Sequence, residues 1–275
     1  MNLIKLGLEK GFSTTDNLFI LYSLINILSN NKKKLFSAFI GFKSAFDTVW
    51  RLGLWRKLLR YNINGRVFTV IKNMYSNVKS YVRLNTDHSN FFTCNMGVRQ
   101  GENLSPFLFS IFLNDLEEYL RNNDVDGINC ETPDIENELY IYLKLCILLY
   151  ADDTVILSES ETGLQHALNV FQNYCKEWQL TVNVDKTKVL IFSKGRPNRN
   201  YNFVFNDKQL EIVNEYKYLG IFMSRSGSFL KTKKYIAEQG SKAMYSLLSK
   251  VRKFDLPFDI TIDLYNKMVL PVLLY

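Results

Sequence analysis

Midway along the chain runs the segment Leu148-Leu149-Tyr150-Ala151-Asp152-Asp153-Thr154-Val155, in which two adjacent carboxylates stand between apolar residues. The two apolar runs predict two strands that meet at the acidic pair, as in a β-hairpin. Two aspartates in a turn are often only a solvated turn, which is one interpretation of the pattern. A hairpin inside a sheet would instead hold both carboxylates rigidly, where they bind hard cations such as Mg²⁺. Two such ions can stabilise the entering and leaving oxygens of a phosphoryl transfer.

The residues around this hairpin predict an irregular alternation of helices and strands. Apolar residues at helical spacing predict helices over about residues 16–29, 51–61, 66–76, 105–122, 161–178, 229–253 and 257–269. Shorter apolar runs predict strands near residues 35–42, 187–193, 201–205, 210–213 and 218–223, and a second hairpin formed by Ser80–Leu84 and Phe91–Asn95. Residues 115–138 are acidic and loosely patterned, which predicts an excursion over the surface. The fold class expected from this order is α+β.

Positive charge is concentrated in one part of the chain. The 275 residues carry a net charge of +7. Residues 184–253 hold 15 Lys or Arg and 5 Asp or Glu, a net charge of +10, whereas the rest holds 19 and 22, a net charge of −3. A basic segment suits phosphate contacts that are independent of sequence and sensitive to salt. The alternative is a helix face that is merely solvated.

Cysteine usage and hydropathy restrict the class of protein further. Cys94, Cys130, Cys146 and Cys175 are widely spaced and form no CxxC pair, which excludes a zinc-finger pattern and argues against a disulfide scaffold. The amino terminus lacks the apolar core of a signal peptide. No apolar run reaches the ~20 residues of a membrane span. We therefore expect a soluble intracellular protein of the nucleus or cytoplasm, with no membrane partner; no protein partner is inferred.

Five motifs occur in an order that resembles one family. They are Phe39-Ile40-Gly41-Phe42-Lys43-Ser44-Ala45-Phe46-Asp47, Gly97-Val98-Arg99-Gln100-Gly101 with Leu104-Ser105-Pro106, Tyr150-Ala151-Asp152-Asp153, Asp185-Lys186-Thr187-Lys188 after Trp178, Leu180 and Asn183, and Tyr216-Lys217-Tyr218-Leu219-Gly220. Over about residues 11–275 they resemble the reverse transcriptases of non-LTR (LINE-type) retrotransposons. The resemblance implies the palm of a right-hand polymerase. Its implied parts are a residual fingers helix region (1–34), the palm with inserted finger elements (35–223) and a partial thumb (224–275).

The resemblance also implies an active site for RNA-templated DNA synthesis. Asp152 and Asp153 would bind metal, two Mg²⁺ ions in the family, and act in catalysis. Lys186 would lie near the leaving pyrophosphate, although it could equally be one of several solvated lysines. Phe46 would lie under the sugar of the incoming nucleotide and exclude a 2′-hydroxyl. A place in the hydrophobic core is the competing interpretation of Phe46.

Substrate contacts are implied at three further places. Arg99, Gln100 and Gly101 would bind the incoming nucleotide and the template, and a glycine there allows close approach of the backbone to a ligand. The turn at Tyr218, Leu219 and Gly220 would hold the primer end, and Lys231, Lys233 and Lys234 would contact phosphates. The implied partners are an RNA template, a DNA primer and deoxynucleoside triphosphates.

One position departs from the family in a way that bears on activity. The family has a catalytic aspartate where this chain has Gly41, which provides no side-chain oxygen. Asp47 is no obvious substitute, because it comes six residues later and beyond the expected strand. Losing a group that merely supports a ligand costs about 10–100-fold, so losing the ligand should cost at least as much. We therefore predict a weak or inactive polymerase. The resemblance also implies shortened fingers, since residues 1–10 are too few to form them, and a shortened thumb.

Three other hypotheses remain open from the sequence. The chain could be a nucleic-acid-binding remnant without activity, which the basic segment would favour. It could be a gene fragment that does not fold alone. A different palm enzyme, such as a nucleotide cyclase, fits less well, because it has no need of the motifs at residues 97–101 and 218–220.

Overall fold

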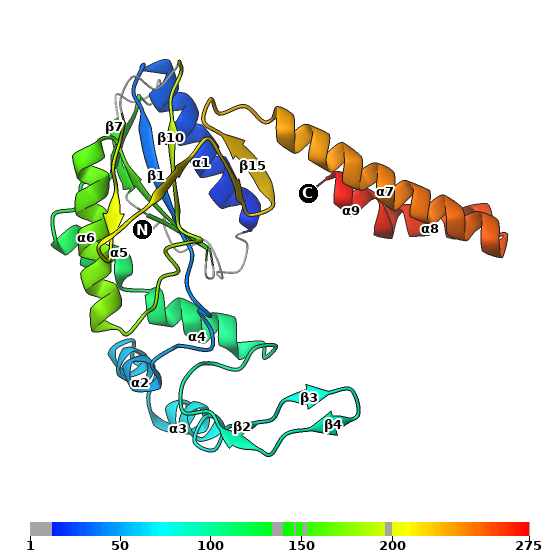
Figure 1. Ribbon diagram of the computed structural model, residues 1–275, viewed down its shortest axis with the longest axis horizontal. Helices are drawn as coiled ribbons and strands as arrows, with labels where there is room; N and C mark the ends of the chain where they lie inside the picture. The colour runs from blue at the N-terminus through cyan, green and yellow to red at the C-terminus, as the bar shows by residue number, and fades with distance from the viewer. Residues whose placement is uncertain (1–12, 134–139, 146, 151–152, 196–199, 275) are drawn as a thin grey trace. The chain divides into compact units, whose positions relative to one another are not determined.

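The computed structural model describes residues 13–133, 140–145, 147–150, 153–195 and 200–274. Its largest sheet has five strands in the order β13, β10, β1, β9, β8 (Figure 1). These strands are β1 (Leu35–Ile40), β8 (Ile147–Tyr150), β9 (Asp153–Ser158), β10 (Lys188–Phe192) and β13 (Glu211–Val213). Strand β1 is antiparallel to both β9 and β10, whereas β13 runs parallel to β10. The expected hairpin is therefore present as β8 and β9.

The central strand β1 lies in the core. All six of its residues are buried, and because successive side chains point to opposite faces of a strand, both faces of β1 are covered. Helix α1 (Thr14–Asn30) contacts β1 and β8, and helix α6 (Glu161–Glu177) contacts β1 and β9. At the start of α1, the Ser13 N–H donates to the Asp16 carboxylate at 2.6 Å, which satisfies a backbone donor that the helix itself leaves free.

The remaining elements of residues 1–214, the first of two compact units, surround this sheet or extend from it. The helices are α2 (Arg51–Arg60), α3 (Gly65–Met74), α4 (Leu104–Leu113) and α5 (Leu116–Asn122). Short strand pairs are β2 (Lys79–Ser80) with β5 (Phe92–Thr93), β3 (Arg83–Leu84) with β4 (Asp87–His88), β6 (Ile128–Pro133) with β7 (Tyr140–Leu145), and β11 (Val204–Phe205) with β12 (Lys208–Gln209). The β3–β4 hairpin projects from the body of this unit (Figure 1).

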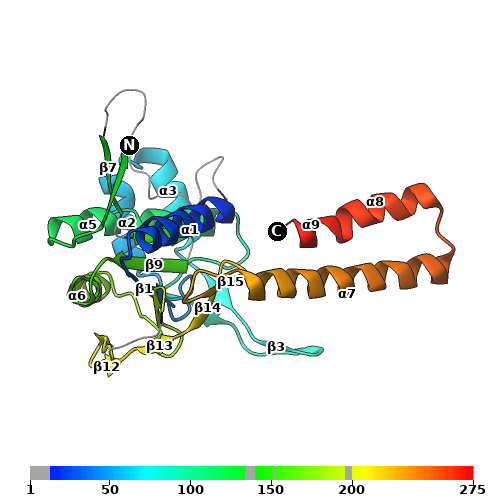
Figure 2. The same cartoon turned by 90° about the horizontal axis from the view of Figure 1, so that it is seen from above.

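The second unit, residues 215–275, is a hairpin of strands followed by helices. Strands β14 (Glu215–Tyr218) and β15 (Ile221–Ser224) pair, and α7 (Leu230–Phe254) is followed by α8 (Phe258–Met268) and α9 (Leu270–Leu273). Helices α8 and α9 run back along α7 (Figure 2). Among the described residues, none of the helices combines the length and the hydrophobicity that a membrane span needs. The three-part division at residues 34 and 223 stays a prediction.

The α+β class is confirmed, and the expected elements are present with some corrections. The single helix predicted over residues 105–122 is wrong, because the chain forms α4 and α5 with a break at Asn114 and Asp115. At Asp115 the backbone leaves helical geometry (φ −94°, ψ 0°), and its carboxylate accepts hydrogen bonds from Lys57 and Tyr174. The helix is thus interrupted at the residue whose side chain forms a buried ion pair with Lys57.

Two further expectations need correction. The surface excursion over residues 115–138 is wrong at its start, because Asp115, Leu116 and Leu120 are buried. The strand predicted near residues 218–223 is a hairpin, in which β14 and β15 meet at a turn formed by Leu219 (φ +44°) and Gly220 (φ +85°). Two consecutive residues with positive φ make the tight turn that suits the twist of paired strands.

Candidate active site

The end of the central strand brings together three positions that the sequence singled out. Ile40 pairs with Thr154, so Gly41 is the next residue in register with Asp153. On the other side Phe39 pairs with Lys188, which places Gly41 in register with Lys186. Gly41, Asp153 and Lys186 therefore lie at one end of the sheet, whereas Asp152 is outside the described residues.

Hydrogen bonds fix the backbone around Gly41. Its N–H donates to Oγ1 of Thr187 at 3.1 Å, and its carbonyl accepts the N–H of Asn183 at 2.7 Å. A Cβ atom at position 41 would lie 2.9 Å from Cβ of Lys186, closer than two such atoms normally approach. The turn at residues 183–187 therefore packs against the glycine, in the space that a side chain at position 41 would enter.

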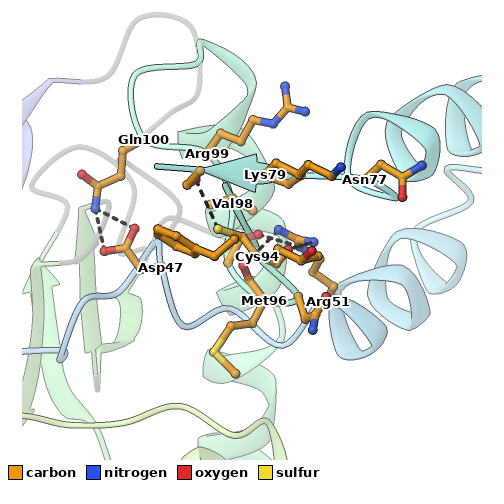
Figure 3. Close-up of a pocket in the computed structure, with 15 residues that line it drawn as sticks. Asp47, Arg51, Asn77, Lys79, Cys94, Met96, Val98, Arg99 and Gln100 are labelled. Carbon is orange, nitrogen blue, oxygen red and sulfur yellow. Dashed lines mark hydrogen bonds between the residues drawn. The ribbon is translucent and has the colours of Figure 1, made fainter. Parts of the chain in front are cut away.

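A complete set of metal ligands is not formed by the described residues. No three His, Cys, Asp or Glu side chains lie together in the part of the chain that the structure describes. The carboxylate of Asp47 is bound by Gln100, whose Nε2 donates to both of its oxygens at 2.8 Å (Figure 3). These hydrogen bonds connect the segment after β1 with the loop at residues 97–101.

The loop at residues 97–101 depends on glycine where it approaches the chain at Asp47. Gly97 has φ +82°, and a Cβ there would lie 2.4 Å from the carbonyl oxygen of Asp47. Gly101 has a similar φ of +85° but nothing within 4 Å of its Cβ position. Arg99, between them, forms an ion pair with Glu102 at 2.6 Å and donates to the carbonyl of Met74.

Phe46 lies at the border of the core. Its ring centroid is 5.1 Å from that of Phe109, and its carbonyl accepts the N–H of Val98 at 2.7 Å. The side chain is only half-buried. The packing suits the interpretation as a core residue, and the open edge suits a contact with a ligand, so both interpretations of Phe46 stand.

A pocket of about 940 Å³ opens beside this loop (Figure 3). Its lining includes Asp47, Arg51, Lys79, Arg99 and Gln100. The guanidinium of Arg51 donates to the carbonyls of Gly97, Cys94, Met96 and Tyr75 at 2.8–3.0 Å, and burial lowers its pKa. Sequence reasoning missed Arg51, because an arginine at the first position of a helix looks like any solvated charge.

The primer-contact candidates all lie in the second unit. Tyr218 and Leu219 are buried, so the turn at Gly220 exposes backbone more than side chain. Lys231 forms an ion pair with Glu215. Lys233 and Lys234 are exposed on α7, and their ammonium groups make no ion pair with any residue that the structure describes.

Comparison with known proteins identifies the family. A family model described as "Reverse transcriptase (RNA-dependent DNA polymerase)" matches residues 5–223, which is most of the chain. The chain belongs to the reverse transcriptase family. The expected resemblance to the polymerases of non-LTR retrotransposons is confirmed by curated relatives.

Two of these relatives show the extent of the similarity. The RNA-directed DNA polymerase from mobile element jockey of Drosophila melanogaster is 27% identical over 253 residues, covering 89% of this chain and 26% of the relative. The Pol polyprotein from type-1 retrotransposable element R2 of Popillia japonica is 24% identical over 221 residues, covering 78% of this chain and 35% of the relative. The reverse-transcriptase chain thus spans about a quarter to a third of the length of these relatives.

Solved structures of telomerase share the fold of this reverse transcriptase. Telomerase from Candida tropicalis, in complex with a fragment of telomeric RNA, aligns with a TM-score of 0.53 at 12% identity, over 84% of this chain and 37% of the other. Telomerase from Candida albicans aligns with a TM-score of 0.50 at 14% identity, over 85% and 39%. At this identity the likeness shows the fold alone, and it confirms the polymerase palm.

A buried lysine on α2 of this reverse transcriptase is a second group that sequence reasoning missed. Nζ of Lys57 donates to Oδ1 of Asp115 at 2.6 Å, to the hydroxyl of Tyr174 at 2.7 Å and to the carbonyl of Phe112 at 2.5 Å. It also lies 3.6 Å from the ring centroid of Trp178. We call Lys57, Asp115 and Tyr174 the lysine cluster.

Burial sets the proton equilibria of the lysine cluster. It lowers the pKa of Lys57 to about 8, against the raising effect of the Asp115 carboxylate, and it raises the pKa of Tyr174. A signal was available in the sequence. Lys57 lies between Leu54 and Leu58 on the apolar side of its helix, where a charged residue needs a buried partner.

Proposed function

We propose that this chain is a domain for RNA-templated DNA synthesis in a non-LTR retrotransposon protein, and that its polymerase activity is weak or absent. The observation that carries the proposal is the position of Gly41. It lies at the end of the central strand beside Asp153 and Lys186, where the family has a carboxylate. The substrates proposed are an RNA template, a DNA primer and deoxynucleoside triphosphates.

The residues present do not fit a complete site for two Mg²⁺ ions. Asp152 and Asp153 are the carboxylates that would hold metal, and Gly41 adds no oxygen to them. The space at its Cβ position is taken by the aliphatic part of Lys186, 2.9 Å away. We therefore derive no catalytic step through bound metal in this chain, and the incomplete ligand set is our reason for expecting weak activity.

Substrate binding depends on groups that this copy keeps. Phe46, Arg99, Gln100 and Gly101 would contact the incoming nucleotide from the loop beside the pocket. Gln100 must then exchange its hydrogen bonds with Asp47 for bonds to substrate, since both carboxylate oxygens accept from it here.

The remaining proposed contacts lie elsewhere in the chain. Lys186 would place a positive charge near the pyrophosphate. The turn at Tyr218, Leu219 and Gly220 would hold the primer through its backbone. Lys233 and Lys234 would contact phosphates, and Lys231 could do so only by giving up Glu215.

The test compares Gly41→Asp with Gly41→Ala in primer extension on an RNA template with Mg²⁺. Both variants add a Cβ that requires the turn at Lys186 to move, but only aspartate adds a carboxylate. We expect at least a tenfold gain in extension for Gly41→Asp and none for Gly41→Ala, since even a supporting residue of a metal site is worth about 10–100-fold. Equal activity of two folded variants would show that the missing carboxylate is not what limits this copy.

A second candidate function is binding of nucleic acid without polymerisation, favoured by the exposed Lys233 and Lys234. A binding titration over salt concentration measures it, because each phosphate contact contributes about 0.7–0.9 to the slope of log affinity against log salt. We expect Lys233→Gln with Lys234→Gln to reduce the slope by about 1–2. Lys267→Gln, whose lysine is already paired with Asp263, is the matched control. Binding that ignores salt would contradict this candidate.

A further inference from the structure

The projecting hairpin of the first unit carries an exposed cluster of aromatic rings. The ring centroid of Tyr81 lies 5.5 Å from that of His88 and 5.2 Å from that of Phe91, both in edge-to-face geometry. Tyr81 nevertheless keeps 46% and Phe91 65% of its surface in solvent. Rings that hold one another in place and stay exposed form a surface that is available for stacking.

An irregularity in the strand pairing places both His88 and Phe91 in this cluster. The β2–β5 pairing and the β3–β4 pairing differ in register by one residue, so Tyr81 faces both Asn90 and Phe91. An extra residue of this kind is a β-bulge, which changes the direction of a side chain. Without it, strict alternation along this strand would place His88 and Phe91 on opposite faces.

The same face carries positive charge. Arg83 pairs with His88 and stands two residues from Tyr81, so the three side chains share one face. Nε of Arg83 donates to the carbonyl of Asn85 at 3.1 Å, and its terminal nitrogens bind no residue that the structure describes. Asp87 is the one acid in the sequence between residues 79 and 93, and alternation puts it on the other face.

The hairpin also adjoins the pocket beside the Gln100 loop. Strands β2 and β5, which carry the hairpin, supply Lys79 and Phe92 to the lining of that pocket. The aromatic face begins at the next residues outward, Tyr81 and Phe91. A strand of nucleic acid in the pocket would therefore meet this face as it continues.

We propose that Tyr81, Arg83, His88 and Phe91 form a stacking platform for unpaired RNA, which we call the hairpin platform. Bases stack on exposed aromatic rings without regard to sequence, and arginine adds contacts to phosphates or base faces. The proposal rests on the proposed function, because the unpaired RNA is the template segment adjoining the pocket. It assigns a role to a hairpin outside the five motifs.

The test measures binding of a fluorescent oligouridylate of about 12 nucleotides, within the range of known single-strand sites, by anisotropy. We expect the double variant Tyr81→Ala with Phe91→Ala to lose about tenfold or more in affinity, since each stacked ring contributes a several-fold effect. Val82→Ala with Leu84→Ala is the matched control on the opposite face, where both residues are also exposed, and should change affinity less than twofold. Unfolding midpoints of both variants check that the fold is kept.

The salt dependence of the affinity distinguishes base stacking from electrostatic attraction to phosphates. The aromatic variant should keep the salt slope of the wild type, whereas Arg83→Gln should lower it by about 1. Unchanged affinity in the aromatic variant would refute the proposal that the hairpin platform binds RNA. If that variant still binds a primer–template hybrid, the proposed function is not affected. Loss of self-association without loss of RNA binding would overturn the platform in favour of contact with a second copy. A wild-type chain that binds neither RNA nor the hybrid would contradict both proposals.

Discussion

Two polar regions of the first unit, the lysine cluster and the end of β1, differ in the number of interacting side-chain groups. In the lysine cluster, the buried ammonium of Lys57 has a carboxylate, a hydroxyl, a carbonyl and an aromatic ring as partners. At the end of β1, Gly41 contributes backbone hydrogen bonds and no functional group. The residues that stabilise this fold are therefore separate from the residues of the candidate site, and a change at position 41 leaves the buried ion pair of Lys57 untouched.

The largest expected loss of stability comes from a substitution in the lysine cluster. Lys57→Met leaves the carboxylate of Asp115 buried without its ion pair, and we expect the free energy of unfolding to fall by about 3–5 kcal/mol. Chemical denaturation measures this loss. Adding Asp115→Leu removes the unpaired charge and should restore more than half of it. A single variant as stable as the wild type would mean that the cluster does not support the fold.

A smaller loss of stability is expected in the loop at residues 97–101, next to the candidate active site. Gly97→Ala combines positive φ with a Cβ only 2.4 Å from the carbonyl oxygen of Asp47, and backbone strain of this kind costs about 1–3 kcal/mol or more. Gly101→Ala has the same sign of φ but open space around its Cβ, so its loss should be smaller. Denaturation of both variants tests this order, and the reverse order would show that the loop is not held against Asp47.

The pH dependence of stability provides a further check on the lysine cluster. The pKa of Lys57 falls from 10.5 to about 8 on folding, so between these values the unfolded chain binds a proton that the native chain has released. The free energy of unfolding should therefore rise with pH over this window, by at most about 1.4 kcal/mol per unit, and this gain is lost as pH falls through 8.

The reference for this measurement is the double variant Lys57→Met with Asp115→Leu, compared with the wild type by urea unfolding between about pH 8 and 9.5. That range stays below the point where Tyr174, whose pKa is raised by burial, begins to oppose the trend. Parallel pH profiles for the two proteins would contradict the assignment of the lowered pKa to Lys57.

The smallest effect is expected at the exposed pair of Lys231 and Glu215. Both side chains are about half in solvent, and exposed ion pairs contribute about 0–1 kcal/mol. We expect Lys231→Gln to change the free energy of unfolding by less than about 1 kcal/mol, measured by denaturation of the full chain. A loss as large as that of Lys57→Met would remove the distinction between buried and exposed pairs on which the comparison depends.

Much of the fold follows from local pattern, and the failures have physical causes. The apolar runs of β1 and β9 predicted the central strands of the sheet, because continuous hydrophobic strands belong in a covered core. The break at Asp115 could not be predicted, since it depends on a partner, Lys57, that lies 58 residues earlier. Likewise, the Gln100 contact with Asp47 joins two motifs whose meeting only the folded chain reveals.

The candidate site was predictable where motif residues share a sheet end. Gly41, Asp153 and Lys186 are brought together by strand register, and all three positions belong to motifs that the resemblance singled out. Arg51 escaped prediction because its partners are backbone carbonyls, and a carbonyl leaves no trace in the sequence. The hairpin platform could not be predicted for a related reason, since only a one-residue shift in pairing places both His88 and Phe91 on the face of Tyr81.

We propose that this reverse-transcriptase domain keeps its fold and lacks a metal ligand that catalysis needs. The most direct measurement is primer extension on an RNA template by the unchanged chain, beside the variant Asp152→Asn. We expect the wild type to extend the primer no faster than this variant, because the proposed ligand set is already incomplete at Gly41. Robust extension by the wild type that Asp152→Asn abolishes would contradict it.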